Sequence, residues 1–182
     1  MRMIRRFAAL VGFAAFAGMV SASSPPTPPT EIAGSPASPL ALVGEARLTK
    51  YMFHIYDARL WAAEGRYDAS RPHALEIRYA RRIAADALTT RTIEEWRRLG
   101  LWDAAREQRW RAVLGRAWPD VEPGDRLLAY IEPGKPMRIF HNGQPYSEFD
   151  DPEFASAFFA IWLDPRTSEP KLRKKLLGLA RR

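Results

Sequence analysis

The sequence contains no cysteine, which excludes disulfides, iron–sulfur clusters and thiol nucleophiles. The folded part must therefore be held together by its own hydrophobic core. Histidine is scarce as well: His54, His73 and His141 are the three in the chain, and none has the short paired spacing of zinc ligands. We expect neither a metal site nor a bound cofactor.

Two common glycine motifs are also missing. Gly124, Gly134 and Gly143 stand in turn-like surroundings, and no glycine-rich phosphate loop accompanies them. No Gly-x-Ser-x-Gly motif is present, so the sequence has no signature of a hydrolase nucleophile. These absences leave the catalytic residues, if there are any, unknown.

The N-terminal apolar run is too short to span a bilayer. It covers Phe7 to Val20, roughly 14 residues, whereas a spanning helix needs about 20. Three arginines precede it, and it ends in the small residues of Val20-Ser21-Ala22. This pattern predicts a secretory signal peptide over residues 1–22, and hence a periplasmic or secreted protein without a stable membrane span after cleavage. The alternative is an N-terminal membrane anchor.

Clustered positive charge is lacking too. The formal net charge of +7 includes the three arginines of the predicted signal peptide, without which it falls to +4. The other basic residues alternate with acidic ones, as in Arg106-Glu107-Gln108-Arg109. A nucleic-acid-binding face would need clustered cations, so we expect no nucleic-acid partner and only a slight preference for anionic small molecules.

The residues after the predicted signal peptide divide into a linker and one domain. Residues 23–39 read SSPPTPPTEIAGSPASP, a Pro/Ser-rich composition typical of a flexible spacer. Residues 40–182 are enough for a single domain with its own core.

The sequence pattern of this domain predicts an α+β fold. Leu42 to Ala63 reads as one or two strands, and Ala74 to Ala80 alternates as a further strand. Strands are also predicted over 126–132, 137–141 and 144–149, with Asn142-Gly143 as a hairpin turn and Pro133-Gly134 in a type II turn. Helices are predicted to begin at four capping residues: Asp86, Asp103, Asp151 and Ser168. The order of elements favours an antiparallel sheet with helices packed mainly on one face.

The segment from Leu42 to Trp61 holds the candidate ligand-binding residues. In an extended chain, Arg47 would share one side with Thr49, Tyr51 and Phe53. A guanidinium among aromatic side chains can bind a carboxylate through two hydrogen bonds while partly buried. The alternative is an edge-strand arginine in water, paired with Glu45.

His54 is interpreted as a core or ligand-lining histidine. Together with the four residues of the extended segment it completes the predicted ligand site: Arg47, Thr49, Tyr51, Phe53 and His54.

Several longer segments resemble one known family. They are LVGEARLTKYMFHIYDARLW, ALEIRYAR, residues 118–125 (WPDVEPGD), His141-Asn142-Gly143 and residues 151–163 (DPEFASAFFAIWL). Over Leu40 to Leu179 the chain resembles the chalcone isomerase-like superfamily, in particular its secreted bacterial members. The resemblance implies an open-faced β-sandwich, with a large antiparallel sheet, helices layered against it and a ligand cleft between them.

The resemblance does not imply that the plant reaction is conserved. In the plant enzymes an arginine, a strand threonine, and a tyrosine and an asparagine on a helix organise the substrate oxygens. Here Arg47 stands near the first position, His54 or Ile55 at the second, and Leu88 and Glu95 near the other two. A leucine cannot replace the hydrogen bonds of a tyrosine. Without that polar network, flavanone formation should be badly impaired.

Three functions follow as hypotheses. The first is an exported protein that binds an amphipathic acidic small molecule such as a fatty acid, with Arg47 on the acid group. The second is an isomerase or lyase for a phenolic or enone substrate, with Arg47 as electrophile and His54 or Tyr56 moving the proton. The third is an interaction protein of the cell envelope. The sequence leaves the oligomeric state open.

Overall fold

A computed structural model describes residues 26–33 and 39–180 of the chain. The predicted signal peptide, residues 1–22, lies outside these ranges. Six strands form one antiparallel sheet in which neighbours along the chain are neighbours in space. They are β1 (Leu40–Lys50), β2 (Phe53–Ala63), β3 (His73–Tyr79), β4 (Arg126–Ile131), β5 (Met137–His141) and β6 (Gln144–Phe149).

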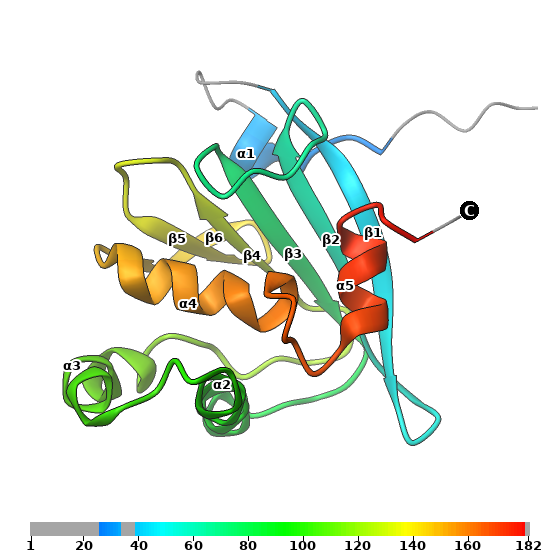
Figure 1. The fold of residues 1–182 in the computed structure, drawn as a ribbon. Helices are drawn as coiled ribbons and strands as arrows, with labels where there is room; N and C mark the ends of the chain where they lie inside the picture. Colours follow the sequence, from blue (N-terminus) through cyan, green and yellow to red (C-terminus); the bar gives the residue numbers. More distant parts are fainter. Residues whose placement is uncertain (1–25, 34–38, 181–182) are drawn as a thin grey trace, which may run out of the picture.

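Helices cover one face of this sheet (Figure 1). They are α2 (Ala85–Leu99), α3 (Ala104–Leu114) and α4 (Pro152–Leu163), while α5 (Pro170–Leu176) packs along β1. The expected α+β architecture, an antiparallel sheet with helices mainly on one side, is confirmed. Within the described ranges, no helix is long and apolar enough to cross a membrane.

The long segment predicted as one or two strands is a hairpin of two strands. It turns at Tyr51 and Met52, whose φ angles are +48° and +67°. Both residues therefore occupy the left-handed region that a type I′ turn requires and that glycine and asparagine normally supply. Neither residue is a turn former, so no sequence signal predicts this turn.

Two other turns were predicted from their residues and are confirmed. Asn142 and Gly143 have φ angles of +49° and +87°, as a type I′ turn between β5 and β6 requires. In the turn between β4 and β5, Gly134 has φ +73° and the Lys135 amide donates to the Glu132 carbonyl at 3.0 Å. This is the geometry of a type II turn with proline and glycine at its centre.

Two of the four predicted helix caps are confirmed. The Asp103 carboxylate accepts a hydrogen bond from the Arg106 amide at 2.8 Å at the start of α3. The Asp151 carboxylate accepts from the amides of Glu153 and Phe154 at 2.9 and 3.1 Å at the start of α4. In both cases a local side chain satisfies amides that have no partner within the helix.

The other two caps were predicted wrongly. Helix α2 begins at Ala85, and a residue distant in sequence, Asp120, accepts from the Ala85 amide at 2.8 Å. Helix α5 begins only at Pro170, after Glu169 at the N-cap position, and Ser168 donates its hydroxyl to Glu95 of α2 at 2.8 Å. A tertiary partner replaces the local cap at the start of α2, whereas no side chain caps α5.

Part of the predicted linker is packed against the sheet. Residues 30–33 form a short helix, α1 (Thr30–Ala33), in which Ile32 is only 1% exposed. Ile32 contacts a hydrophobic cluster on the face opposite α4, which includes Trp61, Leu128 and Phe140. Glu31 of the same helix also pairs with Arg126 of β4, so residues that precede the expected domain start near residue 40 pack against the sheet.

Candidate ligand cavity

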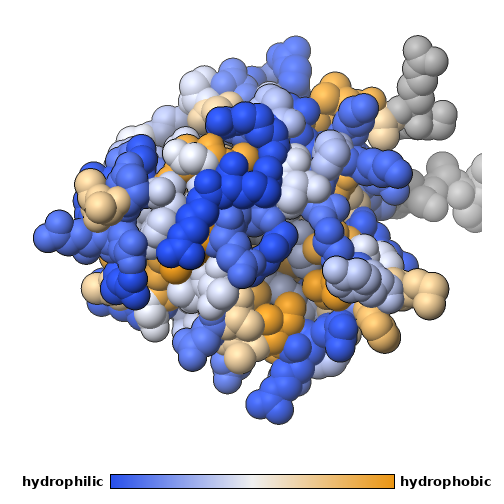
Figure 2. Space-filling view, turned by 60° about the horizontal axis from the view of Figure 1, so that its bottom comes forward, coloured by the Kyte–Doolittle hydropathy of each residue, from blue (hydrophilic) through white to orange (hydrophobic). Residues whose placement is uncertain are grey.

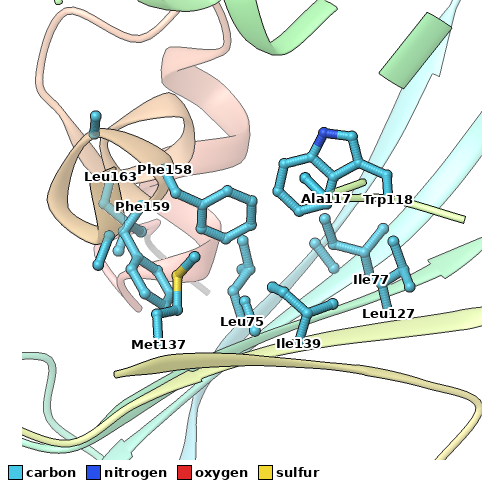
Figure 3. Close-up of a cluster of buried hydrophobic side chains, with 14 of the residues drawn as sticks. Leu75, Ile77, Ala117, Trp118, Leu127, Met137, Ile139, Phe158, Phe159 and Leu163 are labelled. Carbon is cyan, nitrogen blue, oxygen red and sulfur yellow. The ribbon is translucent and has the colours of Figure 1, made fainter. Parts of the chain in front are cut away.

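A cavity of about 470 Å³ lies between the sheet and the helices that cover it. This volume is within the range of roughly 300–1,000 Å³ that is usual for small-molecule sites. Figure 3 shows Phe158 of α4 and Trp118 facing the sheet residues Leu75, Ile77 and Ile139. The cavity is lined mainly by apolar side chains of this kind: Leu48, Ile55, Leu75, Ile77, Ile83, Leu88, Leu127, Ala129, Ile139, Phe158 and Ile161.

The alternation of β3 explains its contribution to the wall. Leu75, Ile77 and Tyr79 line the cavity, whereas Arg78, between two of them, is exposed on the other face. Side chains of a strand alternate between the two faces of a sheet. A register shift after Leu48 leaves Ile55 of β2 without a partner residue in β1, so that it lines the cavity beside Tyr56.

Two phenol groups introduce polarity into this apolar space. The Tyr56 hydroxyl accepts a hydrogen bond from Trp162 Nε1 at 2.9 Å, and its own proton has no acceptor among the described residues. The Tyr79 hydroxyl makes no hydrogen bond within the same ranges. Burial raises the pKa of both phenols far above the ordinary value, so both stay protonated donors. They can each donate to an oxygen atom of a ligand.

Charged groups gather at one end of the cavity. Lys50 at the end of β1 forms an ion pair with Glu169, and Arg91 of α2 pairs with Glu95. All four residues, with Ser168, belong to the cavity lining. We call this group the polar mouth.

Glu95 is the most constrained member of the polar mouth. Its side chain is only 4% exposed, and it accepts hydrogen bonds from Arg98 Nε at 2.9 Å and Ser168 Oγ at 2.8 Å in addition to the Arg91 contact. Burial raises the pKa of this carboxyl group, but the hydrogen bonds from Arg98 and Ser168, together with the neighbouring guanidinium charges, outweigh it and lower the pKa. Glu95 thus ties α2 to the segment that precedes α5.

We expect Glu95→Gln to lower the free energy of unfolding by about 1–2 kcal/mol at neutral pH, because the charge-assisted hydrogen bonds weaken. The folded-state pKa is lowered, so the carboxylate stabilises the fold above its ordinary pKa of 4.5 and this contribution disappears as the pH falls through the folded-state value. The stability difference between wild type and variant should therefore shrink below about pH 4.5.

Urea denaturation at several pH values measures this difference. Glu94→Gln is the matched control, because Glu94 lies next to Glu95 on the same helix but is exposed, and Arg91, at 3.2 Å, is its one ion-pair partner in the described part of the chain. It should change the stability by less than about 0.5 kcal/mol. A Glu95→Gln variant as stable as the Glu94→Gln control at neutral pH would contradict the prediction.

Arg47 does not lie in the cavity. It projects from the opposite face of the sheet, where its side chain is 62% exposed and Nε donates to Asp57 Oδ1 at 2.8 Å. That hydrogen bond raises the pKa of Arg47 and lowers the pKa of Asp57. The expectation of a guanidinium in an apolar cleft is thus corrected, because Ala46 and Leu48 turn toward the helices and place Arg47 between them on the solvent side.

The structure also separates the other four predicted site residues. Tyr51 borders the cavity at the polar mouth, whereas Thr49 and Phe53 are exposed and do not line it. His54 lies outside the lining as well, with Nε2 at 3.2 Å from Asp57 Oδ2. Thr49 precedes the turn at Tyr51 and Met52, whereas Phe53 and His54 follow it at the start of β2.

Sequence reasoning missed the residues of the polar mouth. Lys50, Arg91, Ser168 and Glu169 were not among the predicted site residues. One signal was available: Glu95 falls on the same helical stripe as Leu88 and Leu99, where an apolar residue is normal. A charged residue on an apolar stripe indicates a buried partner or a site.

The comparison with known families agrees with this geometry. The family model described as chalcone isomerase-like matches residues 29–178. The chain belongs to the chalcone isomerase-like family. Three positions that the sequence resemblance equated with polar groups of the plant enzymes, Ile55, Leu88 and Glu95, line the cavity of this chalcone isomerase-like chain.

One relative in sequence and one solved structure are similar to this chain. A Haemophilus influenzae protein described as uncharacterized is 30% identical over 137 residues, which cover 75% of this chain and 67% of the relative. The crystal structure of an Arabidopsis thaliana fatty-acid binding protein has a TM-score of 0.59 and 10% sequence identity, over 79% of this chain and 90% of that chain. At that identity the likeness concerns the fold alone, and it confirms the expected chalcone isomerase-like fold.

Proposed function

We propose that this protein is exported and binds an amphipathic acid, such as a long-chain fatty acid, in the cavity between sheet and helices. The observation that carries the proposal is an apolar cavity of about 470 Å³ with charged side chains at one end. A fatty acid has the same division into a long apolar chain and one charged group. The fold is shared with a protein described as fatty-acid binding, and the N-terminal sequence pattern supports export.

Arg91 is the residue we assign to the acid group. It lies at the polar mouth and its side chain is more than half exposed, so it can reorient. If Arg91 turned toward a ligand carboxylate, Glu95 would keep its hydrogen bonds from Arg98 and Ser168 and would not be left unpaired. An arginine can then bind the carboxylate through two parallel hydrogen bonds. Arg47, on the other face, takes no part in this arrangement.

Equilibrium dialysis of the full chain with labelled palmitate tests the proposal. Ala129 is buried in β4 and lines the cavity, so Ala129→Phe would place a phenyl ring in the space that the alkyl chain needs. We expect this variant, and Arg91→Ala, each to bind palmitate at least about tenfold more weakly than wild type. Arg91→Ala should leave the binding of the matched alcohol, hexadecanol, unchanged, because that ligand carries no charge.

Two control variants sharpen the test. Arg97→Ala removes an exposed arginine from the same helix, and Arg47→Ala removes the arginine of the opposite sheet face. Both should bind palmitate as wild type does. Palmitate binding that is absent in wild type, or that is lost with Arg47→Ala and retained with Ala129→Phe, would refute the cavity as the binding site.

The isomerase or lyase hypothesis has less support. It required Arg47 and either His54 or Tyr56 to meet at one substrate, but of these residues only Tyr56 lines the cavity. A reaction that uses Arg47 as electrophile therefore lacks a common site for its groups.

A further inference from the structure

The tip of the β1–β2 hairpin exposes hydrophobic side chains to a degree that is unusual for a folded domain. Tyr51 is 92% exposed, Met52 96% and Phe53 59%. The hairpin extends beyond the other strands and past α5 (Figure 1). Figure 2 turns this end of the molecule toward the viewer and shows hydrophobic surface between the charged side chains. We call Lys50 to Phe53 the hairpin tip.

The hairpin tip is also conformationally strained. Tyr51 and Met52 both hold positive φ angles, which bulky residues rarely adopt. Asparagine followed by glycine would form the same type I′ turn without strain, as Asn142-Gly143 does elsewhere in this sheet. Stability therefore does not explain two large hydrophobic residues at this turn. Strain of this kind is a reason to look for a function.

Cations lie within the hairpin tip and beside it. The Arg81 guanidinium lies over the Phe53 ring, 5.0 Å from its centroid, and has no acidic partner among the described residues. Lys50, within the tip itself, forms an ion pair with Glu169, and Arg82 lies next to Arg81, paired with Glu122 at 3.1 Å. An exposed apolar tip beside an uncompensated cation is complementary to a surface with an apolar interior and anionic groups.

We propose that the hairpin tip docks the protein on an anionic lipid bilayer. Aromatic and aliphatic side chains partition into the boundary between head groups and acyl chains, while arginine and lysine remain at the level of anionic head groups. A protein partner fits less well, because three side chains on a narrow turn offer far less than the roughly 800 Å² per partner of a stable interface.

The docked orientation has a consequence for the cavity. Lys50 and Tyr51 belong to the hairpin tip and also line the cavity at its polar mouth. Docking through the tip therefore brings the polar mouth to the bilayer surface, where an amphipathic acid partitions. This consequence rests on the proposed function, but docking itself does not require any ligand.

The double variant Tyr51→Asn/Met52→Gly separates docking from folding. It removes both exposed hydrophobic side chains and supplies the residue pair that a type I′ turn prefers. The variant should therefore fold with a melting temperature at or above that of wild type. Leu179→Ser is the matched control, because Leu179 is 63% exposed but follows α5 at the opposite end of β1.

Co-sedimentation with vesicles of phosphatidylcholine containing about one-third phosphatidylglycerol measures docking. We expect wild type and Leu179→Ser to bind, with an affinity that falls as salt is added. The double variant should bind at least about tenfold more weakly. Backbone amides of residues 50–54 should exchange hydrogen more slowly when vesicles saturate the protein, a readout independent of any contribution from the N-terminal residues.

Three results would overturn the proposal: no vesicle binding by wild type, equal binding by the double variant, or unchanged exchange at the hairpin tip in the presence of saturating vesicles. The cavity variant Ala129→Phe distinguishes this proposal from the previous one. It should dock as wild type does even though it binds palmitate poorly. Failure of fatty-acid binding would thus leave the docking result intact.

Discussion

Replacing Gly44 by alanine is expected to lower the free energy of unfolding by about 3 kcal/mol. A Cβ atom at this position would lie 2.2 Å from the carbonyl oxygen of Lys175 and 2.7 Å from that of Leu176. Both are backbone atoms of α5, and Leu176 is fully buried, so no flexible side chain can move aside. The added methyl group must displace the helix from β1.

Thermal and urea unfolding measure this loss, and Gly115→Ala serves as the matched control. Gly115 has a right-handed helical conformation with φ −62°, and the nearest atom to an added Cβ lies at 3.7 Å. Its substitution should change the stability by less than about 0.5 kcal/mol. If Gly44→Ala proved as stable as Gly115→Ala, the close approach of α5 to β1 would not exist in solution.

The Gly44→Ala variant also bears on the cavity. Ser168 and Glu169 of the polar mouth immediately precede α5, whose position depends on its contact with β1. A displaced α5 would separate Glu169 from Lys50. We therefore expect the variant to alter palmitate binding even under conditions in which it remains folded.

Asp151→Ala is expected to lower the free energy of unfolding by a similar amount, about 3 kcal/mol. One carboxylate oxygen caps α4, and loss of such a cap costs about 1 kcal/mol. The other accepts a hydrogen bond at 2.8 Å from Nε1 of Trp110, whose side chain is fully buried. The alanine variant leaves this indole donor unsatisfied inside the core, which costs about a further 1–3 kcal/mol.

The conservative variant Asp151→Asn discriminates between the two contributions. An asparagine has one oxygen, so it can cap α4 or accept from Trp110, but not both in the native geometry. We expect roughly half of the loss seen with alanine. Asp150→Ala, at the exposed neighbouring position, is the control and should be close to neutral. Equal stability of Asp150→Ala and Asp151→Ala would refute the assigned role.

The helix cap at Asp151 also affects the cavity. It fixes the start of α4, the helix that carries Phe158, Ile161 and Trp162 along one wall of the cavity. A frayed first turn of α4 would loosen that wall. The two positions with the largest expected effects on stability therefore hold α4, which forms one wall of the cavity, and α5, which directly follows Ser168 and Glu169 of the polar mouth.

The sequence resemblance to the chalcone isomerase-like family correctly predicted the fold, and local pattern correctly predicted most of the elements. The turn at Asn142-Gly143 and the caps at Asp103 and Asp151 were predictable because their stabilising contacts lie within a few residues. The turn at Tyr51-Met52 was not predictable in this way, because pairing between β1 and β2 imposes a conformation that these residues disfavour. Likewise, the cap of α2 comes from Asp120, which is 35 residues away in sequence.

The position of Arg47 could have been predicted correctly from the sequence. Ala46 and Leu48 are apolar, whereas Glu45, Arg47 and Thr49 are polar, and this alternation alone puts Arg47 on the solvent face of β1. The prediction instead grouped Arg47 with the aromatic residues that follow, which belong to the turn and to the next strand.

The sequence by itself determined the order of strands and helices and the alternation that assigns β-strand residues to one face or the other, because these depend on local periodicity and composition. The family came from the resemblance of its longer motifs to the chalcone isomerase-like family. Only the tertiary structure decided which cations reach the cavity and which face water. Lys50, Arg91 and Glu169 come from a strand end, a helix and a connecting segment that are far apart in the chain. These residues come together only because of how the helices pack on the sheet, and no local sequence pattern encodes that packing.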